Sequence, residues 1–385
     1  MSTGTPGVDA SPAETYNASS LMSTLLLKLT GGGRRGIPSL DGLRALSILL
    51  VIFGHLHGTR YFLPAETPGQ GVDWNWGNLG VRVFFVISGF LITTLMLQEW
   101  EKTGTLSLRS FYFRRTLRIF PPFLVFLACM LVLTQAGVLA IPWREFVYAA
   151  TYTMNFSADR GWNLGHLWSL AVEEQFYLLW PFVMVALGVR KALRCALAVV
   201  LISPFLRLGL SYALPSQIPG IGNTFYTIAD PLAIGCCLAG YSGELSKNLR
   251  YQAFLRSNWI YAIAASIPVV NALPGTKLSF LIYQSFLNLA IAVLLDSVVH
   301  HPNRAAGRFL NWSPLRAIGV LSYSLYLWQQ LFVDHGGTYG WNAFPANVVL
   351  AGMAALLSFY LVELPALSLR KKAEVRPNVV AAGAA

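Results

Sequence analysis

Charged residues are scarce in this sequence. Lys, Arg, Asp and Glu make up 12% of its 385 residues, while hydrophobic residues make up 55% and the mean hydropathy is +0.53. Soluble globular domains carry about 25% charged residues. The composition therefore excludes an ordinary soluble protein and predicts an integral membrane protein.

Cysteine is scarce as well. The sequence has only 4, namely Cys129, Cys195, Cys236 and Cys237, and all of them fall in apolar stretches. No pair has the spacing of a zinc site, and a disulfide framework would need paired cysteines outside the membrane. We therefore expect small core residues here, and no metal.

What the sequence does have is long apolar stretches. A helix needs about 20 apolar residues to cross a bilayer, and strands of a barrel would alternate in hydropathy instead. We therefore predict an all-α, polytopic membrane helix bundle of about ten transmembrane helices. The predicted segments are 40–58, 80–98, 119–140, 166–188, 192–213, 225–242, 257–275, 279–299, 314–333 and 344–364.

The basic residues orient this bundle. Of the 28 Lys and Arg, we assign 21 to cytoplasmic connections, 5 to exterior ones and 2, Arg44 and Arg207, to the spans. The positive-inside rule then places both termini in the cytoplasm. The net charge of +11 follows from basic loops that face an anionic leaflet, so the partner it indicates is the lipid bilayer and no nucleic acid.

Three regions are expected along the chain. Residues 1–38 form a flexible N-terminal tail, residues 39–365 the membrane domain, and residues 366–385 a basic C-terminal tail. No Lys or Arg precedes the short apolar run that begins at Leu21, which argues against a secretory signal. No connection is long enough to hold a soluble domain.

Two ionisable residues lie within the first apolar stretch. Arg44 and His55 are eleven residues apart, so on a helix they share one face to within about 20° and are separated by about 16 Å. Such groups at membrane depth cost roughly 2.5 to 3.5 kcal/mol and suggest a functional site. His55 is suited to proton transfer near neutral pH; alternatively Arg44 anchors the helix and His55 meets a structural partner.

The fourth apolar segment carries a polar face. His166, Ser169, Glu173 and Tyr177 follow one another at steps of three and four residues, so they lie on one side of a helix. Glu173 is placed to orient a histidine or to donate a hydrogen bond when protonated. The alternative is that Glu173 is a structural partner of arginines such as Arg44.

Basic residues gather before the third segment. Arg114, Arg115 and Arg118 would lie at a helix end on the cytoplasmic side, and guanidinium groups bind phosphates in bidentate fashion. We therefore predict a bound cytosolic polyanion, with membrane anchoring as the alternative for any single arginine. In the second segment, Ser88 and Gly89 favour close helix packing over a nucleophilic serine. Asp230 is a membrane-depth carboxylate without an evident role.

Taken together, these segments resemble acyltransferase family three, whose integral membrane members move an acyl group onto hydroxyls of sugars and other acceptors. The resemblance follows family order over residues 38–365. The segments that carry it are Leu40 to Leu46 with His55, Phe84 to Ile92, Phe111 to Pro121, His166 to Pro181, Ala229-Asp230 with Gly235, and Ile318 to Trp328.

The resemblance implies a bundle of ten helices in a bacterial inner membrane and an acyl-CoA donor, acetyl-CoA in particular, reached from the cytoplasm. It implies a critical Arg44 and His55 pair, Arg115 and Arg118 with Arg114 at the donor entrance, and Glu173 in the core. The acceptor would be a hydroxyl of a carbohydrate, a glycolipid or a glycosylated natural product. We expect no soluble esterase-like C-terminal domain of the kind that some members carry, and Gln329 stands where members commonly have a histidine.

Our mechanistic hypothesis makes His55 the general base for the acceptor hydroxyl, with Glu173 or His166 holding its tautomer. Arg44 binds the donor or stabilises the oxyanion. A proton-coupled transporter or flippase would use the same intramembrane residues and is the competing hypothesis. We expect six further residues to contact substrate: Ser88, Trp168, Ser169, Tyr177, Asp230 and Tyr323.

Overall fold

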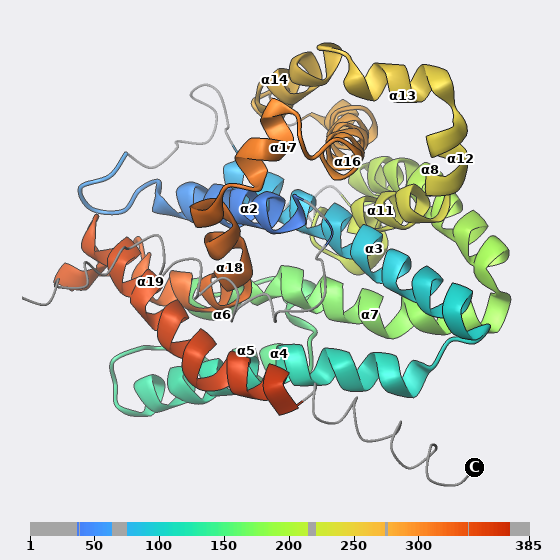
Figure 1. The fold of residues 1–385 in the computed structure, drawn as a ribbon. Helices are drawn as coiled ribbons and strands as arrows, with labels where there is room; N and C mark the ends of the chain where they lie inside the picture. Colours follow the sequence, from blue (N-terminus) through green and yellow to red (C-terminus); the bar gives the residue numbers. More distant parts are fainter. Residues whose placement is uncertain are drawn as a thin grey trace, which may run out of the picture. The chain divides into compact units, whose positions relative to one another are not determined.

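The computed structural model describes residue 37 and residues 39–63, 75–214, 221–273, 276–337 and 339–369. Every element of secondary structure within these residues is a helix (Figure 1). The all-α fold class is therefore confirmed. The predicted N-terminal tail, and the predicted C-terminal tail beyond residue 369, lie outside the described residues.

The helices follow one another through short connections. Their bounds are α2 Leu40–Leu56, α3 Trp76–Thr103, α4 Leu108–Gln135, α5 Trp143–Ala150, η1 Met154–Phe156, α6 Trp162–Gly165, α7 Leu167–Leu187, α8 Val189–Ala213, α10 Phe225–Ile228, α11 Asp230–Gly240, α12 Ser242–Lys247, α13 Leu249–Arg256, α14 Trp259–Asn271, α15 Lys277–Leu281, α16 Tyr283–His300, α17 Ala305–Leu310, α18 Ser313–Phe332, η3 Gly340–Asn342, α19 Ala346–Ser358 and η4 Phe359–Glu363.

Six described helices are long and apolar enough to cross a membrane, and α13 with α14, bent by 69°, would make up to 7. The six run over Trp76–Thr103, Leu108–Gln135, Trp162–Leu187, Val189–Ala213, Ser279–His300 and Ala346–Leu369. Each of our ten predicted segments contains a helix in the structure, but the count of ten membrane crossings and the cytoplasmic termini stay predictions.

The predicted segment 225–242 is shorter than expected. It divides into α10 and the 11-residue α11, which begins at Asp230 with Pro231 in its first turn. Proline is favoured there because the first turn has no partner for a backbone N–H, whereas inside a helix it would remove a hydrogen bond. The sequence Asp230-Pro231 therefore starts a new helix where we had predicted a continuous one.

Helix α2 packs closely against its neighbours α3 and α18 (Figure 1). A Cβ atom on Gly319 of α18 would collide with the backbone carbonyl of Asp41 on α2. A Cβ atom on Gly89 of α3 would likewise collide with the carbonyl of Leu232 on α11. The close helix packing predicted at Gly89 is confirmed, and α2, with its ionisable residues, is enclosed by other helices.

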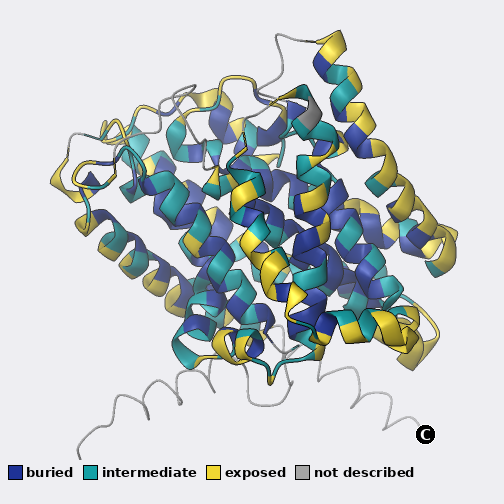
Figure 2. Ribbon diagram, turned by 90° about the horizontal axis from the view of Figure 1, so that it is seen from above, coloured by how far each residue is buried: buried dark blue, intermediate teal, exposed yellow. Residues whose placement is uncertain are grey.

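Large apolar side chains cover outward faces of the long helices. Leu201, Ile202 and Phe205 on α8 and Leu178 and Phe182 on α7 are all exposed, while residues turned toward the neighbouring helices are buried (Figure 2). Contiguous apolar surface of this kind is rare on soluble proteins, and hydrocarbon is its natural surroundings. The chain is a multi-pass integral membrane protein.

Candidate active site

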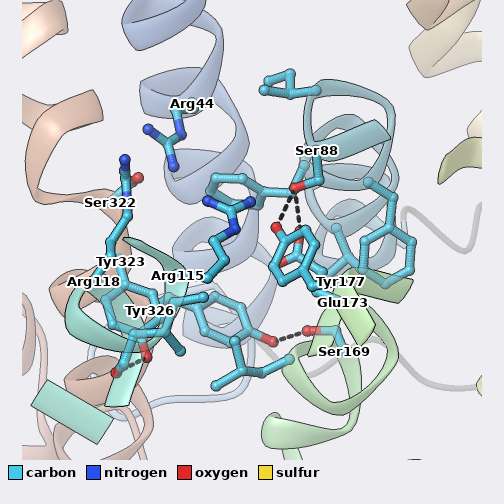
Figure 3. Close-up of a pocket in the computed structure, with 16 residues that line it drawn as sticks. Arg44, Ser88, Arg115, Arg118, Ser169, Glu173, Tyr177, Ser322, Tyr323 and Tyr326 are labelled. Carbon is cyan, nitrogen blue, oxygen red and sulfur yellow. Dashed lines mark hydrogen bonds between the residues drawn. The ribbon is translucent and has the colours of Figure 1, made fainter. Parts of the chain in front are cut away.

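Three arginines converge on a cavity within the bundle, which we call the arginine cavity (Figure 3). Arg44 comes from α2, and Arg115 and Arg118 from the first turns of α4. None of the three forms an ion pair with a described carboxylate. The cavity is narrow, about 70 Å³, and its full lining is Arg44, Val81, Phe84, Phe85, Ile87, Ser88, Arg115, Arg118, Ile119, Ser169, Leu170, Glu173, Tyr177, Ser322, Tyr323 and Tyr326.

The basic segment is helical because of its sequence. Helix α4 begins after Ser107, whose side chain accepts a hydrogen bond from the backbone N–H of Ser110, as a helix N-cap does. Arg115 and Arg118 are then three residues apart and share a face. Arg114 points instead to the end of α3, where it forms an ion pair with Glu99 at 2.8 Å. The predicted cluster of three thus contributes two arginines to the cavity, and Arg114 does not line it.

A chain of hydrogen bonds runs along one wall of the arginine cavity (Figure 3). The hydroxyl of Tyr177 donates to Ser88 Oγ at 2.9 Å, and Ser88 Oγ donates to Glu173 Oε1 at 2.6 Å. The guanidinium of Arg115 lies over the ring of Tyr177, 4.0 Å from its centre, a favourable cation–π geometry. Glu173 therefore fixes Ser88 and does not reach His55, contrary to the tautomer-holding role we considered for it.

Histidines line a second cavity, which we call the histidine cavity. Its volume is about 610 Å³, within the range of about 300 to 1,000 Å³ typical of small-molecule sites. It is lined by Val51, Gly54, His55, His57, Asn75, Trp76, Gly77, Asn78, Val81, Arg160, Gly161, Trp162, Gly165, His166, Trp168, Tyr326, Gln330 and His335.

The ring of His55 is held by an amide. His55 Nδ1 lies 2.9 Å from Gln329 Oε1, and His55 Nε2 lies 3.5 Å from Gln330 Nε2. Because the amide oxygen only accepts, Nδ1 carries the proton and Nε2 keeps its lone pair. Gln329, fully buried on α18, thus stands in the place where we expected Glu173 or His166. His166 shares the cavity wall with His55 but is not in contact with Nδ1.

The two cavities meet at a common wall. Val81 on α3 and Tyr326 on α18 line both of them. The hydroxyl of Tyr326 is anchored, because it donates to the backbone carbonyl of His166 at 2.7 Å and is hydrogen-bonded to Ser169. Since Arg44 lines one cavity and His55 the other, a single helix presents a cation to the first and an imidazole to the second.

The remaining predicted residues fall into two groups. Ser88, Ser169, Tyr177 and Tyr323 line the arginine cavity, and Trp168 lines the histidine cavity. Asp230 lines neither of them. It forms a buried ion pair with Arg207, at 2.7 and 2.9 Å from the two guanidinium nitrogens, and accepts from Asn288 at 2.8 Å. Both oxygens of Asp230 are thus used in contacts within the protein, so its role is structural and it does not face the substrate.

Sequence reasoning missed several lining residues. Tyr326, Gln330, Trp162 and Arg160 come together only through contacts between distant segments. One signal was present: Gln329 and Gln330 are adjacent amides in an apolar helix, and polar side chains at that depth need partners. Among the described residues, no group of three His, Cys, Asp or Glu side chains is placed to hold a metal ion.

The candidate site thus consists of half-buried arginines beside a hydrogen-bonded carboxylate, next to a histidine cavity inside a membrane helix bundle. A family model described as an acyltransferase domain matches residues 37–364, which is most of the chain. The chain belongs to this acyltransferase family, and the resemblance found in the sequence is thereby confirmed.

Curated relatives show the same similarity. The chain is 29% identical to the O-acetyltransferase OatA of Staphylococcus aureus over 88% of its own length and 58% of that protein. It is 30% identical to the peptidoglycan O-acetyltransferase OatA of Listeria monocytogenes over 78% and 50%, respectively. A putative peptidoglycan O-acetyltransferase of Bacillus subtilis, YrhL, is 28% identical over 86% and 55%. The chain thus spans little more than half the length of these relatives. No solved structure matches it.

Proposed function

We propose that this chain is a membrane O-acyltransferase that moves an acetyl group from acetyl-CoA to a hydroxyl of a carbohydrate or glycolipid, with His55 as the general base. The named activity of the relatives supports acetyl transfer to oxygen. Because those relatives are bacterial proteins, we further propose the bacterial plasma membrane as the location.

The arginine cavity is suited to the donor. Arg115 and Arg118 have no carboxylate partner among the described residues, and their guanidinium groups would bind the phosphates of CoA. Arg44 lines the same cavity, about 16 Å along α2 from His55, so we assign it to the donor and not to the oxyanion. That separation is comparable with an extended pantetheine arm.

The histidine cavity is suited to the acceptor. With Nδ1 held by Gln329, the Nε2 of His55 takes the proton of the acceptor hydroxyl. The hydroxyl oxygen then forms a bond to the thioester carbon, the carbon–sulfur bond breaks, and the CoA thiolate takes the proton back from Nε2. General-base catalysis of this kind contributes typically about 10²- to 10⁴-fold.

One observation carries the proposal. A single helix, α2, presents Arg44 to the first cavity and His55 to the second, and the two cavities share the wall at Val81 and Tyr326. A donor anchored by its phosphates in the first cavity would extend its thioester past this wall toward His55. Anchoring at one end and reaction at the other is how binding energy positions a reactive group.

The test is acetyl transfer by the purified protein in proteoliposomes, followed with radiolabelled acetyl-CoA and a polysaccharide or glycolipid acceptor. We expect His55→Ala to lose about 10²-fold or more of the rate, while His301→Ala, a histidine outside both cavities, keeps it. A folded His55→Ala protein that transfers acetyl at the normal rate contradicts the proposed base. Proton-coupled transport without acetyl transfer would favour the transporter hypothesis instead.

A further inference from the structure

The histidine cavity contains a cation that proton transfer by His55 does not use. Arg160 lies in the connection between η1 and α6 and lines this cavity. Its guanidinium carbon is 5.9 Å from the centre of the Trp168 ring. No ion pair joins Arg160 to any described carboxylate. The side chain is half-buried, so its charge is only partly solvated by water.

A buried acidic side chain beside this connection is already engaged. Glu145 on α5 is buried and accepts a hydrogen bond from the backbone N–H of Gly161, the residue after Arg160, at 2.9 Å. It does not line the histidine cavity. Arg160 is therefore held close to a carboxylate without being paired to it, and its donors remain available to a ligand.

Arg160 is the one Lys or Arg in the described lining of the histidine cavity, and this lining contains no Asp or Glu. Burial lowers the pKa of the Arg160 guanidinium, yet arginine keeps its proton in proteins. A concave site with charge of one sign raises the local concentration of oppositely charged ligands. The cavity should therefore favour an anionic acceptor over a neutral one.

The other walls fit a sugar ring. Trp76, Trp162 and Trp168 contribute indole rings to the lining, and Asn75, Asn78 and Gln330 contribute amide groups. Apolar walls with a few placed polar groups are typical of small-molecule sites. The flat faces of indole rings pack against the C–H faces of a pyranose, and amides bond to its hydroxyls. The lining thus combines groups for a sugar with one fixed cation.

We propose that the acceptor is a sugar that bears an acidic group, a carboxylate or a phosphate, and that Arg160 binds this group while His55 meets the hydroxyl to be acylated. The proposal rests on the proposed function and adds the chemical class of the acceptor. A guanidinium binds a carboxylate or phosphate through two parallel hydrogen bonds. With the acidic group fixed at Arg160, the sugar hydroxyl that reaches His55 is determined by its position on the ring.

The experiment compares related sugars with and without an acidic group. Labelled acetyl transfer in proteoliposomes is measured with N-acetylglucosamine against N-acetylmuramic acid, with methyl glucoside against methyl glucuronide, and with glucose against glucose 1-phosphate. The first and third pairs keep the C6 hydroxyl in both members. The second and third pairs separate carboxylate from phosphate as the source of the charge.

We expect the wild-type protein to prefer an acidic member over its neutral partner by about 10- to 100-fold in kcat/KM, as a charge-assisted pair of hydrogen bonds would give. In Arg160→Gln this ratio falls toward one, and Arg160→Lys restores part of it, because Lys keeps the charge without the planar fork. The matched control is Arg144→Gln, an exposed arginine on α5, which keeps the wild-type ratio.

Equal rates within each pair, a preference for the neutral members, or no reaction with any acidic sugar overturns the proposal. So does an Arg160→Gln protein that keeps the wild-type ratio. Loss of the proposed function has a different signature. In that case the wild-type protein transfers no acetyl to any sugar, or His55→Ala transfers it normally, whatever the ratio between acidic and neutral acceptors.

Discussion

Two groups of arginines lie within the membrane bundle, and their surroundings differ. Arg207 on α8 is fully buried and bonded to both oxygens of Asp230, and Arg82 on α3 donates to Asn288 at 3.0 Å, which in turn donates to Asp230. In the arginine cavity, Arg44, Arg115 and Arg118 have no ion-pair partner among the described carboxylates.

The presence or absence of an ion-pair partner distinguishes a structural arginine from one available to a ligand. A buried cation whose donors are all satisfied stabilises one arrangement of helices, and losing its partner leaves an uncompensated charge. A cation that lines a cavity without a partner is already placed for a ligand, and its removal costs affinity and not stability. We therefore propose two roles for arginine in this bundle, a structural one for Arg207 and a ligand-binding one for the arginines that line the cavity.

The largest effect is expected at the paired group. Asp230→Ala leaves Arg207 buried and unpaired, which should lower the free energy of unfolding by about 3 to 5 kcal/mol. The measurement is thermal unfolding in detergent, with acetyl transfer measured on the protein that remains folded. Replacing both partners, as in Arg207→Met/Asp230→Leu, should recover part of the loss. If Asp230→Ala unfolds at the wild-type temperature, the ion pair of Arg207 and Asp230 does not stabilise the fold, and the contrast between the two groups of arginines is lost.

The next effect is expected at the arginine cavity. Arg118→Ala should raise the KM for acetyl-CoA by an amount equivalent to roughly 1.5 to 3 kcal/mol, the contribution of hydrogen bonds to a charged group, without lowering the unfolding temperature. With S-acetylpantetheine, which has no phosphate, mutant and wild type should have the same KM. Arg109→Ala, exposed on the same helix, is the control. An Arg118→Ala defect that persists with S-acetylpantetheine argues against phosphate binding.

A smaller effect is expected at the amide that holds His55. Gln329→Leu removes the acceptor for Nδ1–H, so both tautomers become populated and kcat should fall by roughly tenfold, equivalent to about 1.4 kcal/mol. Gln329→Glu places a carboxylate there and should move the acidic limb of the pH–rate profile to higher pH, because a negative neighbour favours the imidazolium. A pH profile identical to wild type in both variants would remove Gln329 from the mechanism.

The smallest effect is expected at the third arginine of the basic segment. Arg114 and Glu99 form a partly exposed ion pair, with side-chain exposures of 30% and 21%, and such pairs contribute about 0 to 1 kcal/mol. Arg114→Ala should leave the KM for acetyl-CoA close to wild type. If its KM rises as much as that of Arg118→Ala, the donor also binds outside the arginine cavity.

Helical spacing predicted part of this arrangement. The eleven-residue interval of Arg44 and His55 and the three-residue interval of Arg115 and Arg118 are properties of single helices, so the sequence was sufficient to place each pair on one face. The same reasoning predicted that Ser169, Glu173 and Tyr177 lie together, as they do in the arginine cavity. Membrane character followed from the composition, and the helix class from the length of the apolar stretches.

Contacts between helices were not predictable in this way. Gln329 and His55 are 274 residues apart, and nothing in local periodicity chooses Gln329 over Glu173 as the partner of the imidazole. Asp230 shows the converse error, because a carboxylate at membrane depth is equally compatible with a ligand and with an ion pair. Only the packing of α8 against α11 decides between them. Hydropathy alone predicts one helix over residues 225–242, but the proline at position 231 begins a new and shorter helix there.

The position of α2 has a mechanical consequence. One rigid helix forms part of both cavities, and its contacts with α3 and α18 are so close that Gly319 has no room for a methyl group beside Asp41. A tilt of α2 at its Arg44 end must therefore displace the imidazole at the other end. A ligand that shifts Arg44 would therefore also shift His55, because both belong to the same rigid helix. A bulky residue in place of Gly319 would disturb both cavities at once.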